Sequence, residues 1–245
     1  MLWLIGGTSD SVIVARHLLA TGKPFIVSVA SDSGKALFEQ EEGIQCVCGK
    51  YTHGDFQELF VLNDIHKVID ASHPFAENVK ENAKRACEAL DIPYIRYERK
   101  DIHLEHVIRV KDYDEAGSEL AKMTGNVLLT TGANHLHIFK KWIGLERLYA
   151  RILPRNESLD IAYDLGFKMD QIIAMKGPFS VEMNEVMLSA YNIQALVTKD
   201  SGPNGGVEEK IEACINKGIK CILIDRPQIE YKTVVYDLDD LEQYL

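Results

Sequence analysis

The sequence has no stretch of apolar residues that approaches the roughly 18 to 20 needed to cross a bilayer. Residues 1–7 carry no basic region and no apolar segment long enough for a signal peptide. We therefore expect a cytoplasmic protein with no membrane partner.

Cysteine is scarce, with 5 in 245 residues. An odd and sparse set does not form the disulfide framework of a small secreted protein. Cys46 and Cys48 lie two apart on an expected strand, and no second Cys or His pair at ligand spacing accompanies them. We predict no metal site there and interpret both as small thiols.

Basic residues are outnumbered, with 27 Lys and Arg against 37 Asp and Glu and a net charge of −10. Such a charge argues against a nucleic-acid partner, because a phosphate backbone would be repelled. The total does not describe local surfaces, and several Lys and Arg residues stand beside glycines at expected strand ends.

Short apolar strands alternate with amphipathic helices along the whole chain. Helices are expected between the strands, for example at 33–41, 55–62 and 113–123. The expected strands are 2–5, 25–29, 44–47, 68–70, 92–97, 107–110, 127–130, 148–152, 171–174, 195–198 and 221–224. This alternation is typical of parallel sheets with helices on both faces.

We predict an α/β fold with two Rossmann-like, doubly wound parallel-sheet domains and a cleft between them. The polar segment 98–101 is interpreted as the crossing between the halves. The N-terminal domain, 1–98, would bind a dinucleotide, and the C-terminal domain, 99–245, would bind the substrate.

The first candidate site is the glycine turn after the first strand, formed by Gly6, Gly7, Thr8 and Ser9. In doubly wound sheets, ligands bind beyond the carboxyl ends of the strands. Glycines let the backbone approach a phosphate, and the following helix offers free N–H groups. The turn lacks the full dinucleotide fingerprint. The alternative is a tight turn capped by Ser9 or Asp10, and we favour phosphate binding.

The end of the second strand usually selects the cofactor. There Asp32 would favour NADH, while Ser31 and Lys35 could serve NADPH. The sequence leaves both open, with a preference for NADH. Ser72 and His73 end another strand at the same edge, where His73 could equally be structural or functional.

The loop 199–206 combines Lys199, Asp200, Ser201 and three glycines, and Lys210 follows one turn into the next helix. Backbone amides and the two lysines would suit the carboxylates of a substrate. A flexible surface loop is the alternative. Upstream, Gly177 and Pro178 form a turn, and Asn184 could be a solvent-facing amide.

Taken together, these loops resemble the precorrin-6A reductases of cobalamin biosynthesis, including the cobalt-precorrin-6A form. The order and spacing of the matching stretches hold along nearly the whole chain. These stretches are 5–10, 27–30, 70–76, 93–99, 128–132, 150–154, 177–180 with Asn184, 198–202, Gly205 and Gly206 with Lys210, and 226–227.

The resemblance implies an NAD(P)H-dependent oxidoreductase that reduces one double bond of a polycarboxylate tetrapyrrole. Arg99, Lys176 and Lys199 would add positive charge to the substrate site. The implied cofactor contacts are Gly6, Gly7, Thr8, Ser9, Ala30, Ser31, Ser72 and His73. The implied substrate contacts are Arg96, Arg151, Gly177, Ser180, Asn184, Ser201, Gly205, Gly206, Lys210 and Arg226.

Two positions depart from the family pattern. Asp10 stands where we expect Glu, and Ala133 stands where a basic residue is common, so that His135 or His137 would have to replace it.

For the chemistry, Lys199 and Arg151 are candidates to stabilise electron density in the ring, and Asp200 or bound water would supply the proton. Two other classes stay open. A methyltransferase would bind S-adenosylmethionine at the glycine turn, and a cofactor-free tetrapyrrole synthase or binding protein would bind no dinucleotide.

Overall fold

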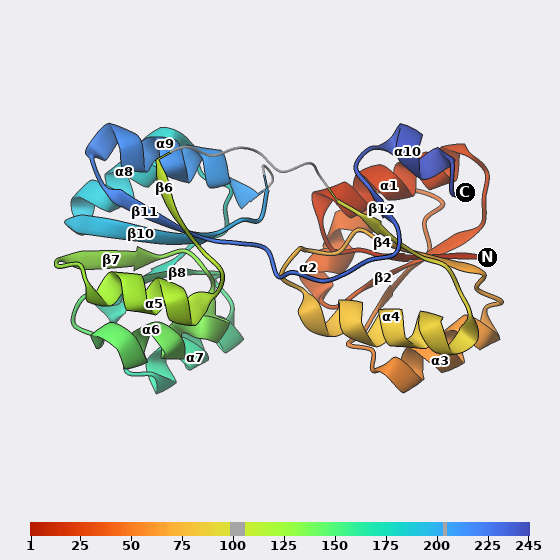
Figure 1. Ribbon diagram of the computed structural model, residues 1–245, viewed down its shortest axis with the longest axis horizontal. Coiled ribbons are helices and arrows are strands. Elements are labelled where there is room, and N and C mark those ends of the chain that lie inside the picture. Colours follow the sequence, from red (N-terminus) through yellow and green to blue (C-terminus); the bar gives the residue numbers. More distant parts are fainter. Residues whose placement is uncertain (99–105, 203–204) are drawn as a thin grey trace. The chain divides into compact units, whose positions relative to one another are not determined.

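The computed structural model describes residues 1–98, 106–202 and 205–245. The chain forms two compact units, Met1–Asp101 with Gln228–Leu245 (unit 1) and Ile102–Pro227 (unit 2). Each unit is a six-stranded sheet with helices on both faces (Figure 1), and all its recorded strand pairs are parallel. The predicted α/β fold of two doubly wound sheets is confirmed. Most of the predicted crossing at 98–101 lies outside the described residues.

Unit 1 has the strand order β12-β5-β4-β1-β2-β3. Its strands are β1 (Leu2–Ile5), β2 (Phe25–Val29), β3 (Cys46–Cys48), β4 (Lys67–Asp70), β5 (Tyr94–Tyr97) and β12 (Val234–Val235). Its helices are α1 (Ser9–Ala20), α2 (Asp32–Lys35), η1 (Ala36–Phe38), α3 (His53–Leu62), α4 (Glu77–Leu90) and α10 (Leu238–Glu242).

The helices of unit 1 pack in pairs on opposite faces of the sheet. Leu18 of α1 and Leu241 of α10 are buried with Leu4 of β1 on one face. On the other face, Trp3 of β1 packs edge-on against Phe60 of α3. Because β1 is buried on both faces, it is apolar throughout, as the sequence pattern indicated.

Unit 2 repeats this arrangement directly, with the strand order β6-β11-β10-β7-β8-β9, so that β7 takes the place of β1 and β10 that of β4. Its strands are β6 (Val107–Val110), β7 (Asn126–Leu129), β8 (Leu148–Ile152), β9 (Ile172–Ala174), β10 (Ile193–Lys199) and β11 (Lys220–Ile224). Its helices are α5 (Tyr113–Ala121), η2 (Ala133–His135), α6 (Leu136–Ile143), α7 (Asn156–Asp164), η3 (Met169–Gln171), α8 (Val181–Ala190) and α9 (Val207–Lys217).

The end of the chain belongs to unit 1, although the sequence analysis placed it in the second half. Segment Gln228–Leu245 returns to unit 1, where β12 pairs with β5 and completes the sheet. Val235 of β12 and Leu241 of α10 are fully buried in the core of unit 1. β12 has only two residues, too few to show an alternating pattern that would reveal it.

The other boundaries differ from the predictions by a few residues. The helix expected at 33–41 begins at Asp32, because Ser31 is the N-cap and accepts a bond from the N–H of Gly34. It is divided into α2 and η1 and ends at Phe38. The strand expected from Ile44 begins at Cys46. No helix in the described ranges is long and apolar enough to span a membrane.

Candidate active site

In unit 1, the strand order reverses between β1 and β4, the place at which doubly wound folds bind ligands. The β1–α1 turn is tied to the end of β4 by a hydrogen bond of 2.8 Å from Thr8 Oγ1 to the carbonyl of Ala71. The predicted cofactor residues of both loops therefore lie at one edge of the sheet.

The glycine turn is held by Ser11, which the sequence analysis did not single out. Its buried hydroxyl accepts the N–H groups of Gly7 and Thr8 at 3.0 and 3.1 Å and donates to the carbonyl of Thr8 at 2.6 Å. Thr8 is the N-cap of α1, in place of the expected Ser9 or Asp10. The signal in the sequence was the spacing Thr-x-x-Ser, which resembles a capping box.

The surroundings of this turn fit a dinucleotide. Gly7 is exposed with φ 104°, a conformation that favours glycine, and a Cβ there would meet nothing within 4 Å. Ser9 is the first residue of α1, so its N–H has no acceptor within the helix. A Cβ on Gly34 would lie 3.4 Å from Gly7 Cα, which brings the ends of β2 and β1 together. The backbone thus forms an open glycine cradle at this edge of the sheet.

The remaining cofactor candidates border the same edge. Ala30 is exposed and Ser31 caps α2. The buried Ser72 hydroxyl has no hydrogen-bond partner among the described residues. His73 Nδ1 accepts the N–H of Phe75 at 3.2 Å, a contact that shapes its own loop.

Arg96 was predicted as a substrate contact, but its guanidinium lies inside unit 1 with an exposed fraction of 1%. It pairs with Asp70 and Glu98, each at 3.0 Å, and donates to the carbonyl of Ser72 at 2.9 Å. Lys80 also turns inward and donates to the carbonyl of Pro74 at 2.5 Å. In the described structure, Arg96 therefore positions the end of β4.

The pKa values of two of these buried groups, Asp70 and Lys80, are both lowered, but for different reasons. Burial by itself would raise the pKa of Asp70, but Arg96, Lys80 and the hydrogen bonds from Ser72 and Tyr94 together lower it. Burial and the nearby Arg96 lower the pKa of Lys80 to about 8. The Asp70–Arg96 pair is the structural centre of this network.

In unit 2, the strand order reverses between β7 and β10. At their carboxyl ends lies a pocket of about 240 Å³. Its lining comprises Thr130, Gly132, Arg151, Ile152, Leu153, Met175, Gly177, Pro178, Phe179, Gly205 and Lys210. The structure thus brings together four predicted substrate residues, namely Arg151, Gly177, Gly205 and Lys210.

Arg151 is fixed on one wall of this pocket. Its guanidinium donates to Asn184 Oδ1 at 2.8 Å and lies 4.5 Å from the centre of the Phe179 ring. Asn184 is buried, in contrast to the solvent-facing amide considered from the sequence, and it donates to the carbonyl of Ser180, the N-cap of α8. Ser180 and Asn184 therefore support the pocket through Arg151.

Lys210 forms another part of the wall. Its ammonium donates to the carbonyl of Gly205 at 2.6 Å, and its exposed fraction is 7%. Gly206 is the N-cap of α9 with φ 62°, and a Cβ on Gly205 would lie 1.9 Å from Ser201 Oγ, so both glycines are needed for this tight path. The path of this loop places the carbonyl of Gly205 where it holds the Lys210 ammonium in the pocket wall.

The two cations that line this pocket, and two basic groups outside its lining, have their pKa values lowered mainly by burial. Burial, followed by Arg151, lowers the pKa of Lys210 to about 7. Burial lowers the pKa of Arg151 to about 10 and also lowers that of Lys199. His135 is stacked on Tyr113, and burial, Lys199 and His137 lower its pKa. Such a site favours an anionic ligand, which would relieve the repulsion between the cations.

Asp200, the predicted proton donor, is buried between two guanidinium groups. Arg109 Nη2 lies 3.2 Å from its Oδ2, and Arg226 Nη2 lies 3.4 Å from its Oδ1. Both contacts hold the Asp200 side chain in place. Arg226 is thereby engaged with the 199–202 loop. Arg109, in β6, was missed because it stands far from Asp200 in the sequence with no motif around it.

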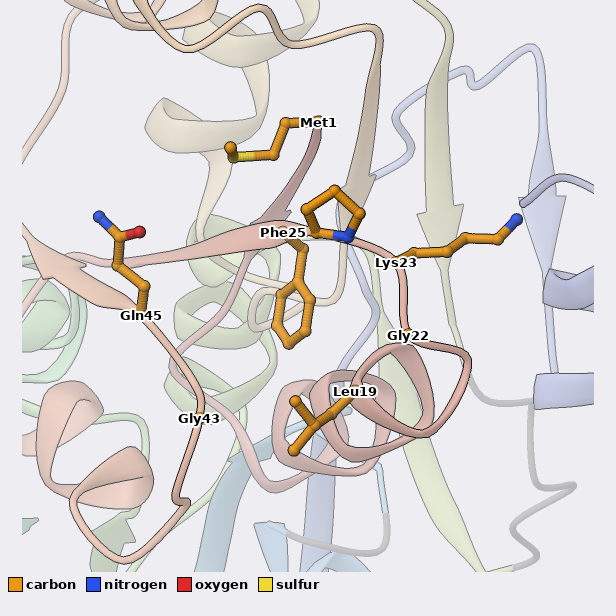
Figure 2. A pocket seen from close by; sticks show the side chains of 8 residues that line it. Met1, Leu19, Gly22, Lys23, Phe25, Gly43 and Gln45 are labelled. Atoms are coloured by element: carbon orange, nitrogen blue, oxygen red, sulfur yellow. The ribbon is translucent and has the colours of Figure 1, made fainter.

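One further hollow lies at the opposite edge of the unit 1 sheet, where β1 and β2 begin (Figure 2). It is lined by Met1, Leu19, Gly22, Lys23, Pro24, Phe25, Gly43 and Gln45. It contains none of the predicted site residues and lies away from the carboxyl ends of the strands, so we do not assign it to the active site.

Comparison with known proteins identifies the family. The model of the family described as "Precorrin-6x reductase CbiJ/CobK" matches residues 1–245. The chain belongs to the CbiJ/CobK family of precorrin-6x reductases. The resemblance inferred from the loops is thereby confirmed, and the chain is an oxidoreductase of cobalamin biosynthesis.

Relatives of this CbiJ/CobK chain match over nearly their whole lengths. The cobalt-precorrin-6A reductase of Methanocaldococcus jannaschii is 34% identical, covering 100% of this chain and 97% of the relative. That of Salmonella typhimurium is 37% identical, with 91% and 86% covered. The solved structure of CobK precorrin-6A reductase matches with a TM-score of 0.79 at 23% identity, covering 99% of this chain and 95% of that one, which supports the fold.

Proposed function

We propose that this chain uses NADH or NADPH to reduce one macrocycle double bond of precorrin-6A or its cobalt complex, giving precorrin-6B or cobalt-precorrin-6B. One observation carries the proposal. The two related sheets place different chemistry at their points of strand reversal, an open glycine cradle in unit 1 and a cationic pocket in unit 2. A dinucleotide suits the first, and a polycarboxylate suits the second.

Unit 1 would hold the cofactor. Gly6, Gly7, Thr8 and Ser9 would border its pyrophosphate, Ala30 and Ser31 its ribose, and Ser72 and His73 its nicotinamide end. When bound, the nicotinamide supplies hydride. Asp32 and Lys35 are both exposed beside the ribose position, so the preference for NADH rests on Asp32 alone.

Unit 2 would hold the substrate. Arg151 and Lys210 would bind carboxylates of the substrate. The other predicted substrate residues would shape the loops around the pocket: Gly177, Ser180, Asn184, Ser201, Gly205, Gly206 and Arg226. Leu153, Met175 and Phe179 line the same pocket and would contact the apolar face of the ring. A wall that combines cations and apolar groups suits a tetrapyrrole with acetate and propionate side chains. The predicted cleft between the two domains stays a prediction.

The cobalt complex is the substrate we favour. Relatives named cobalt-precorrin-6A reductase are 31% to 37% identical to this chain. Two named precorrin-6A reductase, from Rhodobacter capsulatus and Rhodococcus erythropolis, are 25% and 24% identical.

Anaerobic incubation with cobalt-precorrin-6A and either nicotinamide cofactor tests the function. We expect loss of the reduced-nicotinamide absorbance in step with a product that has gained two electrons. The preferred cofactor is the one oxidised faster at equal concentration. Gly6→Trp should abolish this oxidation, because even a Cβ on Gly6 would lie 3.0 Å from Ser11 Oγ.

If neither cofactor is oxidised, the metal-free substrate is tried next. Failure with both substrates would refute the reductase proposal. Binding of S-adenosylmethionine would then favour a transferase, and tetrapyrrole binding without any nucleotide would favour a synthase or binding protein.

Asp200 and Lys199 are the catalytic residues predicted from the sequence. Given its two ion pairs, we propose that Asp200 acts by fixing the strand end that carries Lys199, whose charge would stabilise electron density in the ring. Asp200→Asn should slow reduction markedly and leave cofactor affinity unchanged, as measured by turnover and by cofactor titration. Turnover equal to that of the wild type would remove Asp200 from the mechanism.

A further inference from the structure

The pocket of unit 2 contains a feature that substrate binding alone does not require. Of its lining residues in the described structure, two are ionisable, Arg151 and Lys210. Arginine does not release its proton in proteins. Lys210 is therefore the group of the pocket wall that can give a proton to a bound ligand at neutral pH.

The contacts of Lys210 hold its ammonium in place without neutralising it. Its recorded hydrogen bond goes to a neutral acceptor, the carbonyl of Gly205, at 2.6 Å. That carbonyl is fixed in turn by the tight 205–206 path that begins α9. A second N–H of the same ammonium can point into the pocket while the first keeps this bond.

Four charged or titratable groups near Lys210 influence its protonation. Arg151 of β8 and Lys199 of β10 disfavour its protonated form, whereas Glu209 of α9 and Cys221 of β11 favour it. Burial is the largest influence, and together with Arg151 and Lys199 it lowers the pKa of Lys210 to about 7. An acid of that strength is close to the optimum for proton transfer at neutral pH.

We propose that Lys210 is the proton donor of the reduction, giving its proton to the ring carbon next to the one that accepts hydride. The proposal rests on the proposed reaction. Hydride from NAD(P)H brings its electron pair and forms one C–H bond. The π electrons of the ring double bond form the second with the proton, as an Nζ–H bond of Lys210 breaks. Lys210 is left as a neutral amine, beside the fixed charge of Arg151, and regains a proton from water.

Lys210→Arg and Lys210→Met separate proton donation from charge. Arginine keeps the cation and its attraction for carboxylates, so substrate affinity should stay near that of the wild type. The turnover of Lys210→Arg should fall by on the order of 100-fold or more, as expected for loss of a general acid. Lys210→Met should lose both turnover and affinity. Lys217→Met, at the exposed end of the same helix, is the matched control and should retain both.

The pH dependence of kcat/KM distinguishes proton donation by Lys210 from a purely structural role. Wild-type kcat/KM should fall as the pH rises above about 7, because the protonated form of Lys210 is consumed. That limb should be missing from the residual activity of Lys210→Arg. Turnover of Lys210→Arg within about threefold of the wild type, less than a general acid contributes, would overturn the proposal. An unchanged alkaline limb would overturn it too.

A measurement on the wild-type protein without ligands covers the case in which the variants do not fold. The assigned ¹³Cε resonance of Lys210 should titrate well below the ordinary lysine value of about 10.4. Titration at the ordinary value would refute the proposal. Absence of any reduction by the wild type would instead refute the proposed function, so the two failures are distinct.

Discussion

Arg96 shows how one buried side chain can support a site that it does not enter. Its partner Asp70 has an exposed fraction of 0%, and the two groups are 3.0 Å apart. Replacing Arg96 with Met leaves the carboxylate buried without its countercharge. We expect the free energy of unfolding to fall by about 3 to 5 kcal/mol, measured by urea denaturation.

The matched control for that variant is Arg16→Met. Arg16 makes an equally direct pair with Glu41, at 2.6 Å, but its side chain is largely exposed. Solvent screening makes such a pair weak, so stability should change little. Similar losses in both variants would contradict the central role assigned to the Asp70–Arg96 pair.

The lowered pKa of Lys210 also predicts how the free energy of unfolding depends on pH. Its pKa is about 7 in the folded protein, against about 10.4 for an ordinary lysine. Between these values, the unfolded chain binds more protons at this position, so its contribution to the free energy of unfolding rises with pH. Below pH 7 both states are protonated and the contribution is constant.

The comparison with Lys210→Met isolates this contribution from that of Lys80, which titrates in an overlapping range. Urea denaturation at pH 6, 7, 8 and 9 should show the wild type gaining stability relative to the variant above about pH 7. A constant difference in stability across this pH series would show that Lys210 binds protons equally in the folded and the unfolded protein.

Helix α1 depends on its first turn for both stability and position. Thr8 Oγ1 accepts the N–H of Ser11 and donates to Ala71, so it joins the start of α1 to the end of β4. Thr8→Val keeps the shape and removes both bonds. We expect a loss of about 1 to 2 kcal/mol in stability and a weaker affinity for the nicotinamide cofactor, measured by denaturation and cofactor titration.

Thr21→Val is the control at the other end of the same helix. Thr21 Oγ1 donates to the carbonyl of Leu18 at 2.7 Å, far along the chain from the glycine turn. Its loss should lower stability modestly and leave cofactor affinity unchanged. If both variants weakened cofactor binding equally, the effect of Thr8 would be one of general stability.

The whole chain is organised so that its last segment completes its first sheet. Leu241 of α10 has an exposed fraction of 0% and lies in the core of unit 1. Leu241→Ala should therefore cost about 2 to 5 kcal/mol. Hydrogen exchange read by mass spectrometry should show faster exchange in unit 1 and little change in unit 2, because each unit has its own core.

Leu62→Ala is the control, because Leu62 is 81% exposed on α3 of the same unit. Its exchange pattern should match the wild type. Faster exchange throughout unit 2 in Leu241→Ala would show that the two units unfold together.

Most elements could be predicted because they satisfy local rules. β1 is a short apolar run, β2 and β8 are mostly apolar, and all three are followed by turn residues and a helix. The rule that ligands meet the carboxyl ends of strands placed the loops at 6–9 and 199–206. The residues that hold these loops, Ser11 and Arg109, were missed, since support residues carry no motif of their own.

The sequence by itself determined the alternation of strands and helices, the loops that carry chemistry and the family. These follow from periodicity, from turn chemistry and from ordered motifs, all of which are local or additive along the chain. Only the tertiary structure decided that Gln228–Leu245 joins unit 1, that Arg96 is buried against Asp70, and that Arg151 and Lys210 share one pocket. The reason is physical, because burial and charge pairing depend on residues that are distant in sequence, and the same arginine or lysine can serve a core or a ligand.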